Sequence, residues 1–260
     1  MRLLLTSDLH SQSSWFDWIA EAHADAVLIA GDLIDGFSPE GLLPQMIAVS
    51  QWAERLQCPL AFCSGNHDAN FAGAVPSTGF EGIDPITASL ALAPKWMDAL
   101  GRPGVVVDGR SEVVQWGDQK LVVTTIPYGG FDDSCLTDRL WDAGSRLRRE
   151  NKLMWFVLHH EPPAGTNVGG PFGDSSLLWR ILENQPDFVL SGHIHGQPYQ
   201  PDGGFAERIG KTWCFNPGVP LQQKARTPNY VWLDTVALTA VWHATAIASN
   251  EPLTHTVLLE

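Results

Sequence analysis

The sequence is poor in basic residues and has no long apolar run. Sixteen Lys and Arg stand against 29 Asp and Glu, so the 260-residue chain has a formal net charge of −13. This excess of negative charge argues against a protein that binds nucleic acid or anionic membranes mainly through its own charge. Apolar runs such as residues 27–30 and 155–158 are far too short to cross a bilayer. If the protein binds phosphate, another group must supply positive potential.

The amino terminus and the cysteines indicate a cytoplasmic protein. After Arg2, only Leu3, Leu4 and Leu5 precede polar residues, so the apolar segment of a secretory signal is missing. The four cysteines form no Cys-x-x-Cys pair, which favours buried, reduced thiols. We therefore expect a cytoplasmic location and no contact with a membrane.

The beginning of the chain predicts a β-α-β unit. Residues 2–7 and 26–30 are apolar runs typical of buried strands, and apolar residues recur at helical spacing between them. Ser14 and Asp17 have the spacing of a capping box, which predicts the start of this helix. Strands and helices that alternate in this way predict an α/β fold with parallel strands.

The remaining predicted elements continue the alternation, with one antiparallel section. Further helices are predicted at residues 43–56, 88–100, 138–150 and 175–183, and further strands at 59–63, 104–108, 112–116, 120–125, 153–158 and 187–190. Asp-Gly and Gly-Asp turns join the three strands between 104 and 125, which predicts local antiparallel pairing. Residues 70–87, rich in Gly, Pro and Ser, predict a long loop. No repeat or break in composition divides the chain, so we expect one domain over residues 1–260.

Acidic, amide and imidazole side chains follow five of the predicted strands directly. They are Asp8 and His10, Asp32, the run Asn66, His67 and Asp68, the pair His159 and His160, and the pair His193 and His195. In open α/β sheets, ligands bind at the edge formed by the carboxyl ends of the strands. We therefore expect these groups to converge.

The residue types suit divalent metal ions. Asp8 and His10, like His193 and His195, stand at i and i+2, where side chains on extended backbone point the same way. Oxygen and imidazole donors without a thiolate favour Mn, Fe, Co, Ni or Zn. The carboxylate of Asp32 has two oxygens and can bridge two ions, as in two-metal hydrolases.

Five short motifs stand in an order typical of one family. They are Asp8-x-His10, Gly31-Asp32, Gly65-Asn66-His67-Asp68, His160-x-Pro162-Pro163 and Gly192-His193-x-His195. Their content and order resemble the calcineurin-like metallophosphoesterase superfamily, and the resemblance extends to the turn Asn216-Pro217-Gly218.

The resemblance implies a fold, a cofactor and a set of roles. The implied fold is a four-layer αββα sandwich with two mixed β-sheets. One metal ion would be held by Asp8, His10, Asp32 and His195, and the other by Asp32, Asn66, His160 and His193. A hydroxide between the two ions would attack phosphorus. His67 would protonate the leaving oxygen or stabilise its charge, with Asp68 as a candidate for orienting the ring.

One ligand position stays open between His159 and His160. The family motif favours His160, but both residues lie at a strand end and alternate between its faces. A register shift of one residue would reverse the choice.

We expect a hydrolase of a small phosphate ester. A diester is slightly favoured, because Lys and Arg, which would clamp a dianionic monoester, are absent from the motifs. A phosphomonoesterase and a nuclease of the same fold are alternatives; the net charge and the lack of a basic stripe disfavour the nuclease. A non-catalytic metal-binding scaffold is an alternative of another class, which the presence of His67 beside all ligand positions disfavours.

Overall fold

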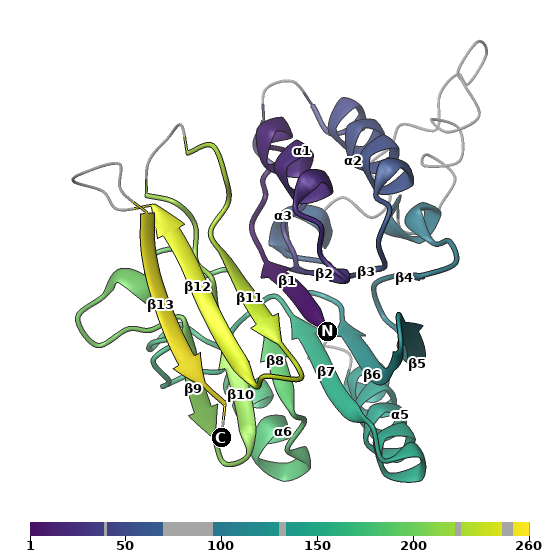
Figure 1. Ribbon diagram of the computed structural model, residues 1–260, viewed down its shortest axis with the longest axis vertical. Helices are drawn as coiled ribbons and strands as arrows, with labels where there is room; N and C mark the ends of the chain where they lie inside the picture. Colours follow the sequence, from purple (N-terminus) through teal and green to yellow (C-terminus); the bar gives the residue numbers. More distant parts are fainter. Residues whose placement is uncertain (39–40, 70–95, 130–133, 222–224, 246–251, 260) are drawn as a thin grey trace.

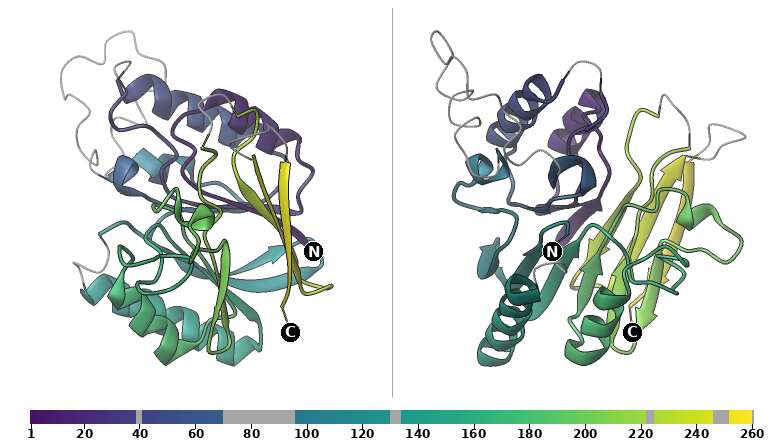
Figure 2. Two further views of the ribbon diagram at one scale, coloured as in Figure 1. Left: turned by 90° about the vertical axis from the view of Figure 1, so that its left-hand side faces the viewer. Right: turned by 180° about the vertical axis from the view of Figure 1, so that it is seen from behind.

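The computed structural model describes residues 1–38, 41–69, 96–129, 134–221, 225–245 and 252–259. Two β-sheets face each other, and helices cover the outer face of each (Figures 1 and 2). The left view of Figure 2 shows α1 and α2 above one sheet and α5 and α6 below the other. The expected αββα sandwich with two mixed sheets is therefore confirmed.

The first sheet has seven strands in the order β13-β12-β11-β1-β2-β3-β4. Their bounds are β1 (Arg2–Thr6), β2 (Ala26–Ala30), β3 (Leu60–Cys63), β4 (Val105–Val106), β11 (Tyr230–Asp234), β12 (Thr239–Thr245) and β13 (Pro252–Leu258). β1 to β4 pair in parallel, whereas β11, β12 and β13 continue from β1 in antiparallel fashion.

The second sheet has six strands in the order β5-β6-β7-β8-β10-β9. Their bounds are β5 (Ser111–Trp116), β6 (Gln119–Ile126), β7 (Met154–His159), β8 (Phe188–Leu190), β9 (Ala206–Ile209) and β10 (Thr212–Phe215). The four central strands, β6, β7, β8 and β10, are parallel, and the edge strands β5 and β9 are antiparallel to their neighbours.

The helices lie outside the sheets. Their bounds are α1 (Ser13–Glu21), α2 (Leu43–Arg55), α3 (Asn66–Ala69), α5 (Ser134–Asn151) and α6 (Ser175–Asn184), with 3₁₀ turns η1 (Trp96–Leu100) and η2 (Gln197–Tyr199). In the described part of the chain, none of these helices has the length and apolar character needed to span a membrane.

Side chains that alternate between the two faces of the buried strands form three hydrophobic clusters, one between the sheets and one beneath the helices on each outer face. In β1, Leu3 and Leu5 face the second sheet, while Leu4 packs with Trp52 beneath α1 and α2. In β7, Trp155 faces the α5 side, where it packs against Trp141. Both faces of these strands are covered, which explains their continuous apolar sequence. Each large side chain buried in this way contributes about 1.5–3 kcal/mol.

Three sequence predictions need correction or lie outside the described residues. α1 begins at Ser13 with Gln12 as N-cap and no side-chain capping bond, so the expected capping box of Ser14 and Asp17 is wrong. The segment at 104–108 contains only the two-residue β4, which pairs in parallel with β3 in the first sheet, because the chain turns at Gly109 before β5 joins the other sheet. The loop at 70–87 and most of the helix at 88–100 lie outside the described residues; η1 occupies the rest.

Candidate metal centre

Five strand ends meet at one edge of the facing sheets. β1, β2 and β3 end there in the first sheet, and β7 and β8 in the second. Within each sheet these strands are parallel, so the residues that follow them lie at the same edge. All seven residues expected to bind metal gather here: Asp8, His10, Asp32, Asn66, His160, His193 and His195.

One group of donors consists of Asp8, His10, Asp32 and His195. One donor atom from each lies within 4.8 Å of the others. His195 Nε2 is 3.1 Å from Asp8 Oδ1 and 3.3 Å from His10 Nε2. His10 Nε2 is 3.9 Å from Asp32 Oδ2. Two carboxylates and two imidazole nitrogens that face one another form a donor set suited to a divalent ion.

A second group of donors surrounds the same Asp32 carboxylate. His160 Nε2 lies 3.2 Å from Asp32 Oδ2 and 3.1 Å from Asn66 Oδ1. The Asn66 oxygen is also 3.0 Å from His193 Nδ1. Asp32 is therefore shared by both groups, in the position that a bridging carboxylate requires.

The structure places His160, and not His159, beside these donors. His160 Nδ1 lies 2.7 Å from the carbonyl oxygen of Ala30, which directs Nε2 toward Asp32. A hydrogen bond from the second ring nitrogen to a backbone carbonyl is the usual arrangement for a metal-binding histidine. The His159 ring lies on the other side of β7, beside Glu161 and Asp174.

Several donors sit on strained backbone. Asp8, His10, Asp32 and His193 have φ values of 55°, 44°, 53° and 64°, in the left-handed region that residues other than glycine seldom adopt. Each such residue costs on the order of 1–3 kcal/mol, and the strain persists only where surrounding structure maintains it. Here the strain turns side chains at the strand ends toward a common point.

Glycines make the close approach of these segments possible. A Cβ atom on Gly65 would collide with the carboxylate and backbone of Asp32, and one on Gly192 would collide with Asp8. The glycines of the motifs are thus required by packing against the donors themselves.

His67 lies at the border of the first donor group. Its ring centroid is 4.7 Å from that of His10, and its Nε2 is 4.0 Å from Asp32 Oδ2. The backbone N–H of Gly36 donates to His67 Nδ1 over 2.9 Å. Because Nδ1 accepts this bond, the proton of a neutral ring resides on Nε2, the nitrogen that faces the donors.

Comparison with protein-family models identifies the family of this chain. Residues 1–197 match the family model of the calcineurin-like phosphoesterases. The chain belongs to this family. No match was found among curated proteins.

Two solved structures resemble this fold over nearly the whole chain. TT1561 of Thermus thermophilus has a TM-score of 0.60 at 15% identity, over 98% of this chain and 97% of that one. The purple acid phosphatase PPD1 from yellow lupin seeds has a TM-score of 0.54 at 13% identity, over 99% of this chain and 53% of that one. At these identities the similarity is one of fold.

The structure shows no hydrogen bond or ion pair between Asp68 and the His67 ring, although we expected Asp68 to orient that ring. Its buried carboxylate accepts backbone N–H bonds from Leu33, Ile34 and Gly65 at 3.2, 3.1 and 2.9 Å. Asp68 therefore ties the loop after β2 to the loop after β3. The carboxylate next to the ring belongs to Asp35, whose Oδ1 is 3.4 Å from His67 Nδ1.

Two further residues border the donor groups. The Tyr128 ring lies 6.0 Å from that of His160 and 6.2 Å from that of His193. The exposed Phe37 ring stands edge-on to His67, with centroids 4.9 Å apart. The sequence offers no motif for Phe37, and the loop around Tyr128 is marked only by its glycines.

Opposite charges dominate the electrostatics of the donor groups. Burial opposes ionisation of Asp8, yet His195 and His160 hold the pKa of its carboxyl well below the usual range. Burial also disfavours the charged form of His160, but Asp32 and Asp8 outweigh this effect and raise its pKa to about 9. In the metal-free chain, the proton on His160 supplies positive charge beside these carboxylates, where a bound metal ion would otherwise supply it.

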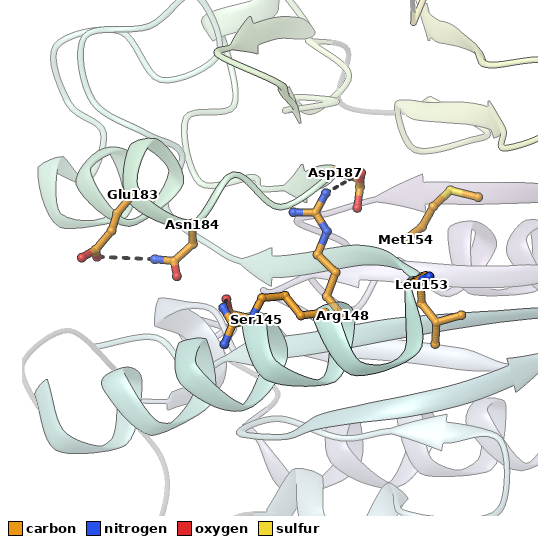
Figure 3. Close-up of a pocket in the computed structure, with 9 residues that line it drawn as sticks. Ser145, Arg148, Leu153, Met154, Glu183, Asn184 and Asp187 are labelled. Atoms are coloured by element: carbon orange, nitrogen blue, oxygen red, sulfur yellow. Dashed lines mark hydrogen bonds and ion pairs between the residues drawn. The ribbon is translucent and has the colours of Figure 1, made fainter.

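One cleft among the described residues lies away from the metal donors (Figure 3). Its volume is about 600 Å³, and its lining includes Leu153, Met154 and Asp187, at the amino ends of β7 and β8. Figure 3 shows Arg148 reaching Asp187, at 3.0 Å, and the same guanidinium donates to the Gln185 carbonyl over 2.6 Å. The arginine is thereby engaged in holding α5 to the second sheet. This cleft is at the opposite edge from the metal donors.

Proposed function

We propose that the protein hydrolyses a small phosphate ester with two divalent metal ions, and that a diester is slightly preferred. The observation that carries the proposal is the position of Asp32, with one carboxylate between the imidazoles of His10 and His160. An active centre of this type also needs a proton donor at its border, a position that His67 occupies.

The residues gathered at this edge fit the two ions. Asp8, His10, Asp32 and His195 would hold one, and Asp32, Asn66, His160 and His193 the other. Four imidazoles, two carboxylates and one amide oxygen suit Mn, Fe, Co, Ni or Zn. When bound, such ions polarise the phosphoryl group and lower the pKa of water, and they supply the positive charge that a chain of net charge −13 lacks.

The chain itself supplies a hydrogen-bond donor for the leaving group. Nδ1 of His67 accepts from the Gly36 N–H, so the ring presents its Nε2 proton toward the donor groups. A leaving alkoxide or phenoxide oxygen near this nitrogen accepts a hydrogen bond from Nε2–H, which stabilises the negative charge that develops as the bond to phosphorus breaks. The Gly36 bond holds the ring in this orientation.

The preference for a diester rests on charge. Among the described residues, the hydrogen bonds and ion pairs of the metal donors involve only Asp, Asn, His and backbone groups. A monoester dianion needs more positive charge than a diester monoanion, and Arg is the usual residue that clamps it. A small substrate, rather than nucleic acid, is consistent with the negative chain.

The test combines metal analysis with a substrate comparison. We expect purified protein loaded with Mn²⁺ to hydrolyse bis-para-nitrophenyl phosphate with a higher kcat/KM than para-nitrophenyl phosphate. Exhaustive chelation should abolish both activities, and Mn²⁺ should restore them. A higher kcat/KM for the monoester would reverse the diester preference. A protein that binds metal at both donor groups without hydrolysing either ester would instead support the scaffold alternative.

A further inference from the structure

Phe37 places an exposed aromatic ring at the border of the metal centre. It lies in the loop after β2, and its side chain is 83% exposed, the highest value among the large apolar residues that the structure describes. The ring stands edge-on to that of His67, with centroids 4.9 Å apart. Single apolar residues are ordinary on a protein surface. The informative feature of Phe37 is therefore its position beside His67, rather than its exposure alone.

Hydrogen bonds hold the backbone under this ring in place. The N–H of Gly36 donates to His67 Nδ1 over 2.9 Å, and the N–H of Phe37 donates to Asp35 Oδ1 over 3.0 Å. The buried side chain of Gln45 accepts from the Asp35 N–H at 2.8 Å and donates to the Asp35 carbonyl at 3.0 Å. The ring is thus fixed directly beside His67. A fixed aromatic side chain loses little conformational entropy when a ligand packs on it.

His67 connects Phe37 with the metal donors. Among the described residues, the rings in contact with His67 are those of Phe37 and of the donor His10, whose centroid lies 4.7 Å away. In the proposed reaction the leaving oxygen lies near His67 Nε2, which is 4.0 Å from the buried Asp32 Oδ2. The carbon skeleton attached to that oxygen has to extend away from the buried donors, toward solvent. On this side of His67 it meets the exposed ring of Phe37.

We propose that Phe37 is the platform on which the leaving group packs, and that the substrate carries an aromatic ring on its leaving oxygen. This inference rests on the proposed function. Aromatic rings attract each other beyond the effect of burial alone, so an aryl group gains more from the Phe37 ring than an alkyl group does. The metal donors act on the phosphoryl group and cannot tell these esters apart. Phe37 therefore selects among phosphate esters of equal charge.

Two diesters that differ only in the leaving group test the platform. The kcat/KM values for methyl para-nitrophenyl phosphate and methyl trifluoroethyl phosphate are compared in Mn²⁺-loaded wild type and variants. We expect Phe37→Ala to lose roughly 10-fold on the aryl ester, mainly through KM, with little change on the alkyl ester. Phe37→Tyr keeps the ring and should keep the wild-type ratio. Trp179→Ala removes another exposed aromatic side chain, on α6, and should change neither value.

The direction of the effect separates a platform from mere support of His67. If Phe37 only held His67 in place, its removal would act like the loss of a hydrogen-bond donor to the leaving oxygen. Such a loss slows the alkyl ester more than the aryl ester, because nitrophenoxide is the better leaving group. An equal or larger loss on the alkyl ester in Phe37→Ala would overturn the proposal.

Binding without turnover separates the platform from the proposed function. Titration calorimetry of the Mn²⁺-loaded protein uses phenylphosphonate and ethylphosphonate, neither of which has a leaving oxygen. We expect wild type to bind phenylphosphonate more tightly and Phe37→Ala to lose this difference. That result in a protein that hydrolyses neither diester would support the platform and overturn the hydrolase. Equal affinities in wild type, or no binding of either phosphonate, would overturn the platform even if both diesters are hydrolysed.

Discussion

Asp32 and His160 come from different sheets, yet Asp32 Oδ2 lies 3.2 Å from His160 Nε2. Asp32 follows β2 in the first sheet and His160 follows β7 in the second. The contact therefore joins the two sheets at the edge where the metal donors gather. Both side chains are almost fully buried, so removing either charge takes away a close partner of the other in a place that water scarcely reaches.

Replacing Asp32 with Asn is expected to remove metal and lower heat stability together. Asp32 is shared by both donor groups, so the loss of its charge weakens both. A ligand that binds only the folded state, at 100 times its Kd, stabilises it by about 2.7 kcal/mol, and the variant would lose this contribution. Metal content and Tm are measured with and without added Mn²⁺. Asp202→Asn, on the exposed surface, should match wild type; full metal content in the Asp32 variant would refute the assignment.

Raising the pH from 6.5 to 9 is expected to destabilise the metal-free protein. Burial lowers the pKa of His160, but Asp32 and Asp8 outweigh this and raise it to about 9, above its ordinary value of 6.5. The protonated ring thus contributes stability that is fully present below pH 6.5 and disappears as the pH rises through 9. The shift corresponds to about 3 kcal/mol.

Urea denaturation in the presence of a chelator at pH 6, 7.5 and 9 measures this effect. His160→Gln removes the titrating ring and should flatten the decline above pH 6.5. Asp8 and Asp32 have lowered pKa values. The stability that their ionised carboxylates contribute is therefore present at neutral pH and is lost only in acid, as the pH falls below their ordinary value of 3.8. Stability that rises between pH 6.5 and 9 in the metal-free wild type would show that His160 is not protonated there.

His67→Ala is expected to lose activity while keeping its metals. The loss of a hydrogen-bond donor that stabilises the leaving oxygen costs roughly 10²–10³-fold in kcat. The loss should be smaller for nitrophenyl esters than for alkyl esters, because nitrophenoxide leaves without needing a proton. A variant with the same fractional loss on both ester types would point to a role for His67 in binding or packing instead. Metal analysis distinguishes these outcomes from loss of the metal centre.

Gly65→Ala is expected to disrupt the metal centre through a steric clash. The added methyl group would collide with the carboxylate and backbone of Asp32, which are held by the strained turn after β2. We expect reduced metal content and a lower Tm. Gly196→Ala is the matched control, because the nearest atom to a Cβ there is 3.9 Å away. Similar behaviour of the two variants would show that the Asp32 turn can move aside.

The β-α-β unit and the placement of donors at strand ends could be predicted from the residues alone. Both follow from local properties: apolar runs such as residues 26–30 are typical of buried strands, and short motifs such as Gly31-Asp32 lie within a few residues of them. The parallel arrangement of strands then brings distant motifs to one edge.

Only the tertiary structure shows which of two candidate residues contacts the site. His160 rather than His159 reaches Asp32, and Asp35 rather than Asp68 lies beside His67. Adjacent residues in a strand face opposite layers, and in the turns the left-handed backbone at Asp8 and Asp32 redirects side chains in ways that residue spacing does not encode. Those orientations depend on contacts between segments far apart in the chain, such as the His160 bond to Ala30.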